Sequence, residues 1–166
     1  TIEIETVIQI LNNDSEFKNW FNNLILEFYK KKIIDKKLIL SIKWLPTFTK
    51  EYNKLINFLI FDDLLEVNQP LNNKLDNLTN LQKLIFGDRF NQPLNNSLDK
   101  LTNLQILVFN KNSVFNQPLN DSLNNLTNLL ELTFGWFFNQ HLNDSLNNLT
   151  NLLELTFDSH FNQPFG

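Results

Sequence analysis

The chain has no cysteine and no methionine, and only three of its 166 residues are glycine. Without cysteine there is no disulfide, no thiolate nucleophile and no cysteine-ligated metal, which favours a reducing compartment such as the cytoplasm. Three scattered glycines are too few for a phosphate-binding loop. No run of about 18 apolar residues occurs, so we expect no membrane span. Because residue 1 is not methionine, we expect the chain to be a piece of a longer protein.

Positive and negative charges are unevenly distributed along the chain. Residues 1–57 contain nine Lys and seven Asp/Glu, a net charge of +2, whereas residues 58–166 contain five Lys/Arg and eleven Asp/Glu, a net charge of -6. A net acidic C-terminal part gives a nucleic-acid backbone few cations to contact. We therefore expect no nucleic-acid partner.

Two short strings recur with one shared period. The string F-N-Q-P-L, or a near copy, has its Asn at positions 68, 91, 116, 139 and 162, in steps of 23, 25, 23 and 23 residues. The string L-T-N-L begins at positions 78, 101, 126 and 149, with steps of 23, 25 and 23 residues. Repeats of this length are typical of solenoids, in which each unit buries its apolar side chains against its neighbours.

One unit contains both the strand and the core positions of the predicted solenoid. Leu84 and Phe86 alternate with polar or outward positions, which predicts a short strand with two inward side chains. The remaining Leu and Phe positions of the unit carry the chain around a core. We expect about four such units over residues 58–166.

The repeat resembles the leucine-rich repeat and, more narrowly, the FNIP repeat found in slime-mould and giant-virus proteins. The resemblance is carried by residues 90–94 and 115–119, which both read F-N-Q-P-L, and by the L-T-N-L strings that follow. It implies an α+β repeat protein, a leucine-rich-repeat-like solenoid with a parallel strand ladder. It also implies binding to a protein partner, in the cytoplasm of a host or in a virus particle.

The recurring Asn and the longer connections have predicted structural roles. We expect the inward side chains of Asn91, Asn116 and Asn139 to form a ladder that satisfies buried backbone groups of the next coil. The connections from Phe61 to Val67 and from Phe109 to Phe115 each span six positions, where others span four. Such insertions in solenoids form bulged loops on one edge, often near the binding face.

Residues 1–57 lack the repeat and are predicted to form a helical cap. Apolar residues from Phe17 to Phe28 recur at helical spacing, and a second helix is predicted from Lys36 to Leu45, ending before Pro46. The FNIP resemblance offers an alternative, since giant-virus FNIP proteins often pair the repeats with an N-terminal F-box that docks to a ubiquitin-ligase adaptor. The Leu-Pro opening usual for that module is missing here.

No catalytic, cofactor or metal site is predicted, and we expect the protein not to be an enzyme. His141 replaces a repeat Pro and His160 occupies a variable turn, and neither has partners at the spacing of a catalytic triad or zinc site. Glu131 and Glu154 hold the same repeat position, about 5 Å apart if the strands stack. They either face water or bind a cationic group of a partner.

The candidate binding residues lie on the outward strand positions, since partners of curved solenoids usually contact the concave strand face. Either a partner or the N-terminal segment covers the apolar members of this set. Trp136 and Phe137 are added as interface anchors, because their counterparts in other units are Asp88 and Arg89, and Ser159 and His160. The outward positions are Phe58, Ile60, Lys83, Ile85, Ile106, Val108, Glu131, Thr133, Glu154 and Thr156.

The sequence thus predicts a non-enzymatic protein-binding repeat scaffold. Two alternatives stay open, a substrate receptor of a cullin ubiquitin ligase and a structural component of a virus particle. Since the chain ends at Gly166 in the middle of a unit, self-association through the last repeat is also expected.

Overall fold

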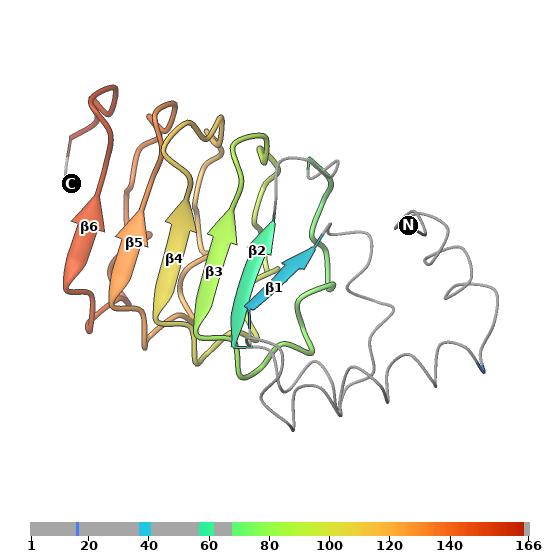
Figure 1. The fold of residues 1–166 in the computed structure, drawn as a ribbon. Helices are drawn as coiled ribbons and strands as arrows, with labels where there is room; N and C mark the ends of the chain where they lie inside the picture. The colour runs from blue at the N-terminus through green and yellow to red at the C-terminus, as the bar shows by residue number, and fades with distance from the viewer. Residues whose placement is uncertain (1–15, 17–36, 41–56, 62–67, 165–166) are drawn as a thin grey trace.

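The structure, a computed structural model, describes residue 16 and residues 37–40, 57–61 and 68–164. Within them, six short strands form one parallel sheet whose spatial order follows the order along the chain (Figure 1). From β3 to β6 the chain returns behind the sheet between one strand and the next, so the predicted solenoid of about four repeat units with a parallel strand ladder is confirmed. The strands are β1 (Lys37–Leu40), β2 (Phe58–Phe61), β3 (Lys83–Phe86), β4 (Ile106–Phe109), β5 (Glu131–Thr133) and β6 (Glu154–Thr156).

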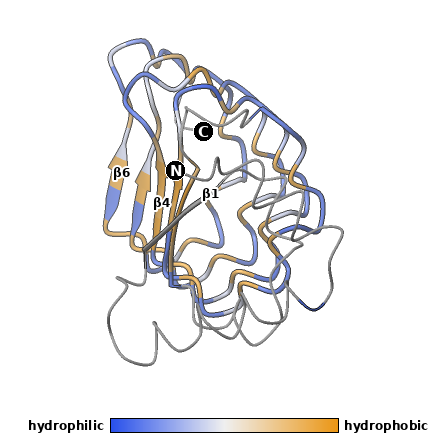
Figure 2. Ribbon diagram, turned by 45° about the vertical axis from the view of Figure 1, so that its right-hand side comes forward, coloured by the Kyte–Doolittle hydropathy of each residue, from blue (hydrophilic) through white to orange (hydrophobic). Residues whose placement is uncertain are grey.

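Alternation along the strands separates the core from the outer face of the sheet. In β2, β3 and β4 the second and fourth residues are buried and the first and third are half-buried. Successive side chains of a strand point to opposite faces, so each strand contributes two side chains to the core. Figure 2 shows β4 hydrophobic along its whole length, whereas β6 begins hydrophilic. The inner face is therefore uniform from coil to coil, while the outer face changes.

The helix predicted from Lys36 to Leu45 is wrong over its described part. Residues Lys37–Leu40 form β1, which pairs in parallel with β2 in the register Lys37↔Phe58. A short apolar run has no periodicity that separates a strand from a helix. The neighbouring strand decides the conformation, because it provides partners for the backbone N–H and C=O groups.

The rest of the predicted N-terminal cap lies outside the described residues, apart from Glu16, whose backbone is helical. The F-box alternative and the division of the chain at residue 57 therefore stay predictions. The described residues include no helix of the length and apolar character that a membrane crossing requires.

Two columns of phenylalanine form part of the core. From β3 to β6, the Phe at or just after the end of the strand stacks on the Phe of the following F-N-Q string, with ring centroids 4.1 Å apart for Phe109 and Phe115. They also stack between coils, with 5.1 Å between Phe86 and Phe109 and 6.0 Å between Phe90 and Phe115. These four rings have at most 1% of their surface exposed. Each buried ring of this size stabilises the fold by about 1.5–3 kcal/mol relative to an exposed one.

The predicted asparagine ladder is confirmed, but its predicted position inside the core is not. The Oδ1 of Asn91 accepts the backbone N–H of Asn116 at 2.9 Å, and the Oδ1 of Asn116 accepts that of Asn139 at 2.9 Å. The prediction that these Asn point into the core is wrong, because Asn91 and Asn139 are half-buried and Asn116 is exposed. The core is filled by Leu and Phe, so the ladder runs along the surface.

Two further recurring features have a structural role that the sequence analysis did not assign. The Asn of each L-T-N-L string donates to the carbonyl of the Thr one coil earlier, as Asn103 does to Thr79 at 2.8 Å and Asn128 to Thr102 at 2.8 Å. A second Asn, directly after each F-N-Q-P-L string or its variant, has a positive φ of 44–46° at residues 72, 95, 120 and 143. Asn tolerates this left-handed conformation better than most residues, which accounts for its recurrence there.

We predict that Phe109→Ala lowers the free energy of unfolding by about 3–5 kcal/mol, because it removes a fully buried ring and leaves a cavity. Urea unfolding followed by circular dichroism measures the change. Phe137→Ala is the matched control, since the Phe137 side chain is 53% exposed and its loss is expected to change stability little. Equal effects of the two substitutions would contradict the assigned core.

We also predict that Asn116→Ala lowers the free energy of unfolding by about 1–2 kcal/mol. It removes the acceptor of two hydrogen bonds, from the Asn139 N–H and the Gln140 Nε2. Asn116→Asp keeps the acceptor oxygen and is expected to retain most of the stability at neutral pH. Thermal unfolding of both variants tests the ladder, and an equal loss in both would show that the amide Nδ2 carries the effect.

Candidate functional site

The outer face of the sheet contains the predicted outward strand residues in two continuous rows. The register aligns Phe58, Lys83, Ile106, Glu131 and Glu154 in one row. Alternation is confirmed for all of them, but exposure is smaller than expected. The outward residues of β2 to β5 are half-buried, and only those of β6 are exposed. The second row contains Ile60, Ile85, Val108, Thr133 and Thr156.

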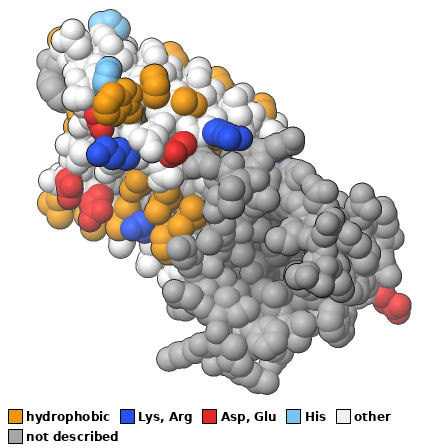
Figure 3. All heavy atoms as spheres, turned by 45° about the horizontal axis from the view of Figure 1, so that its top comes forward, with side chains coloured by type: hydrophobic (Ala, Val, Ile, Leu, Met, Phe, Trp, Pro, Cys, Tyr) orange, Lys and Arg blue, Asp and Glu red, His pale blue; other side chains and the backbone are white. Residues whose placement is uncertain are grey.

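The outer face changes from apolar to acidic across the sheet. The Lys83 Nζ lies 5.2 Å from the centre of the Phe58 ring, a cation–π distance. Glu131 and Glu154 are paired by the register of β5 and β6, as predicted from their repeat positions. The Thr156 hydroxyl donates to the Glu154 carboxylate at 3.4 Å. Figure 3 shows acidic side chains gathered beside a hydrophobic group on this face.

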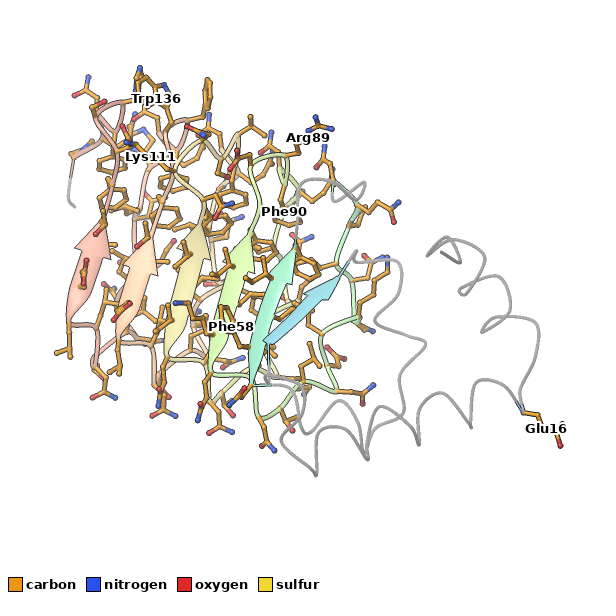
Figure 4. All side chains as sticks on the ribbon, viewed as in Figure 1. Glu16, Phe58, Arg89, Phe90, Lys111 and Trp136 are labelled. Carbon is orange, nitrogen blue, oxygen red and sulfur yellow. The ribbon has the colours of Figure 1, made fainter. Side chains whose placement is uncertain are left out.

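A second surface lies on the turns that follow the strands, and we call it the turn edge. It comprises Val114, Trp136, Phe137 and His160, with Lys111 and Asp158 beside them. Figure 4 shows Arg89, Lys111 and Trp136 beyond the carboxyl ends of the strands, on one edge of the molecule. Trp136 is 38%, Phe137 53% and Val114 39% exposed. Among the described residues, they are three of the four exposed large hydrophobic side chains.

The backbone of the longer connection positions the turn edge. The N–H of Trp136 donates to the carbonyl of Lys111 at 2.8 Å, and that of Phe137 to the carbonyl of Ser113 at 3.4 Å. Gly135 allows this approach, because a Cβ on it would lie 2.8 Å from the Cβ of Ser113 and still closer to the carbonyl oxygen of Asn110. The predicted insertion between Phe109 and Phe115 is thus a loop on the edge that contains Trp136.

An aromatic and charged group surrounds the Trp136 ring. The Trp136 and His160 rings lie 4.3 Å apart between centroids, tilted by 38°. The Asp158 carboxylate accepts the Ser159 N–H at 2.6 Å and the Ser159 hydroxyl at 3.0 Å. These two hydrogen bonds, with smaller contributions from Lys111 and His160, hold the pKa of Asp158 below its ordinary value.

The adjacent Asp158, Ser159 and His160 do not have the geometry of a catalytic triad. The serine hydroxyl donates to the aspartate and lies 3.5 Å from the His160 Nδ1. In a triad the imidazole lies between the serine and the carboxylate. Within the described ranges, no group of three or more His, Asp or Glu is placed to hold a metal ion. His141 is exposed in the coil that precedes His160.

The sequence analysis singled out Trp136 and Phe137, both of which are exposed, but not the residues beside them. Lys111 and His160 come from neighbouring coils and contact Trp136 only when the coils stack. Two features of the sequence could have pointed to these residues. One is the longer connection from Phe109 to Phe115, and the other is an alignment of the residues that precede the core Phe of each unit. By that alignment Arg89, Val114, Phe137 and His160 occupy equivalent places.

Comparison with protein-family models and with curated proteins gave no match. Among solved structures, an internalin from Listeria monocytogenes is similar over 66% of this chain and 36% of its own, with 23% identity and a TM-score of 0.41. This chain therefore matches about a third of that protein. The solenoid assignment rests on the strand ladder, and the FNIP resemblance stays a prediction.

We predict that Ser159→Ala raises the pKa of Asp158 toward its ordinary value, because one of its two stabilising donors is lost. A lowered folded-state pKa contributes stability that is present above the ordinary aspartate pKa and lost as pH falls through the lowered value. Ser159→Ala should therefore lower stability at neutral pH, and the variant should lose less stability than the wild type as pH falls through the aspartate range. Carbon-13 NMR titration of the carboxyl group measures the shift. Lys111→Ala should raise the pKa less, and an unchanged pKa in Ser159→Ala would contradict the assignment.

Proposed function

We propose that this protein is a non-enzymatic protein-binding scaffold that contacts its partner through the turn edge. The observation that carries the proposal is that the exposed Val114, Trp136 and Phe137 lie on adjacent turns, which backbone hydrogen bonds from Trp136 and Phe137 join. Large exposed aromatic side chains are the usual anchors of protein interfaces, because burying them on binding releases much apolar surface from water.

The rigidity of the edge supports this proposal. Backbone hydrogen bonds to the preceding coil hold Trp136 and Phe137, and the His160 ring packs against the indole. Side chains that are ordered before binding lose less conformational entropy when a partner covers them. A solenoid also resists deformation along its sheet, since each coil bonds to the next.

The ligase-receptor alternative depends on residues 1–57, which lie almost wholly outside the described residues. It differs from the general scaffold in one testable respect, which is that the captured proteins would include an adaptor and a cullin. The particle-component alternative would be supported by finding the chain in purified virus particles.

We predict that the immobilised chain captures a host protein and that Trp136→Ala/Phe137→Ala abolishes the capture. Mass spectrometry of proteins retained from a lysate of the native host identifies the partner, and calorimetry with that purified partner measures the loss. Removing one anchor that contributes about 2 kcal/mol weakens binding about 30-fold, so the double variant is expected to lose more than that.

The matched control for this measurement is Leu153→Ala. Leu153 is 82% exposed and comes just before β6, at the opposite ends of the strands from Trp136. It should leave the capture unchanged. A partner that binds wild type and double variant equally would remove the turn edge as the binding site.

A further inference from the structure

The outer face of the sheet has a chemistry distinct from that of the turn edge. Its part over β2 to β4 contains half-buried aliphatic side chains at Ile60, Ile85, Ile106 and Val108. The residues that continue the same rows over β5 and β6 are acidic or hydroxylic. A contiguous surface therefore joins an apolar half to an anionic half.

Glu131 and Glu154 are neighbours with like charge. Strands in a sheet lie about 4.8 Å apart, so paired residues bring the two carboxylates close together. Like charges directly opposite each other on neighbouring strands destabilise a sheet. In the described part of the chain, the hydrogen bond given to either carboxylate comes from the Thr156 hydroxyl, and no cation pairs with them. Among the residues of β2 to β6, whose side chains the structure describes, the cation on this face is Lys83, which lies two strands from Glu131, over the Phe58 ring.

We propose that the outer sheet face binds a basic, partly aliphatic peptide segment of a partner protein. The aliphatic side chains of the segment contact Ile106 and Val108 and the apolar rows beyond them. Its Lys or Arg side chains pair with Glu131 and Glu154. The occupant follows from charge complementarity, because a cation there relieves the repulsion between the two carboxylates while apolar contacts remove water from β4.

The size of the face sets the length of the segment. From β2 to β6 there are four strand-to-strand steps, which give about 19 Å at about 4.8 Å per step. An extended chain covers that distance with about six residues at about 3.3 Å each. The segment is therefore short, with its aliphatic residues and its cations at opposite ends.

This inference rests on the proposal that the chain is a protein-binding scaffold, but it uses a different surface. The test is fluorescence anisotropy of the whole chain with two labelled synthetic peptides. One has three aliphatic residues followed by three Lys or Arg, and the other has Glu in place of the cations. We expect the basic peptide to bind and the acidic peptide not to bind.

Glu131→Gln/Glu154→Gln should weaken binding of the basic peptide about tenfold at low ionic strength, and less at high salt, which screens the charges. Gln keeps the shape of Glu, so the fold is expected to persist, and circular dichroism checks it. Val108→Thr, nearly the same shape but more polar, should weaken binding a few-fold with little dependence on salt.

The matched control is Asp121→Asn/Asp144→Asn. These residues are also exposed carboxylates at one repeat position of adjacent coils, and they lie away from the strands. An equal loss in this control would overturn the proposal, because it would show diffuse attraction to an acidic protein. Equal binding of the acidic peptide would overturn it as well.

Two further outcomes distinguish this inference from self-association of the chain and from binding through the turn edge. If sedimentation shows that wild type self-associates and Glu131→Gln/Glu154→Gln does not, the occupant is a second copy of the chain and the proposal fails. If a host protein is captured through Trp136 and Phe137 while neither peptide binds, the inference fails and the proposed function stands. Peptide binding that persists in Trp136→Ala/Phe137→Ala supports the inference independently of the turn edge.

Discussion

The contact between equivalent residues of successive coils is the interaction on which the described structure depends. The parallel strands pair without a shift of register, so Leu84 lies beside Leu107 and Phe86 beside Phe109. Each coil alone has a single layer of apolar side chains and no partner for its strand. Only stacking buries those side chains and satisfies the strand's N–H and C=O groups.

The same constraint produces the ladders and the surfaces. Because equivalent residues of successive coils lie beside each other, the Asn91 side chain reaches the backbone of Asn116 and the Phe rings stack in columns. It also places Glu131 beside Glu154, where the two negative charges repel each other. The repeat thus enforces contacts that stabilise the core and, at one pair of outer positions, a contact that costs free energy.

Departures from the repeat make the surface of one coil differ from that of the next. The coil that is two residues longer places Lys111 and Ser113 against the next coil, where Gly135 leaves room for them. Trp136 and Phe137 occupy positions that hold Asp88 and Arg89 two coils earlier. These substitutions leave the core unchanged, because the inward Leu and Phe of each strand are kept. Binding properties can therefore differ between coils while the scaffold stays the same.

The period of the sequence by itself determined the solenoid, the direction of its strands, the inward Leu and Phe columns and the existence of the asparagine ladder. Tertiary structure alone decided three points. It decided that Lys37–Leu40 is a strand, since pairing with β2 outweighs the weak local preference of a short apolar run. It decided that the ladder lies at the surface, because Leu and Phe fill the interior. It also decided which residues surround Trp136, because Lys111, Asp158 and His160 belong to other coils and meet only when the backbones stack. A local pattern specifies what each coil must bury, but the distances between side chains of different coils exist only in the assembled ladder.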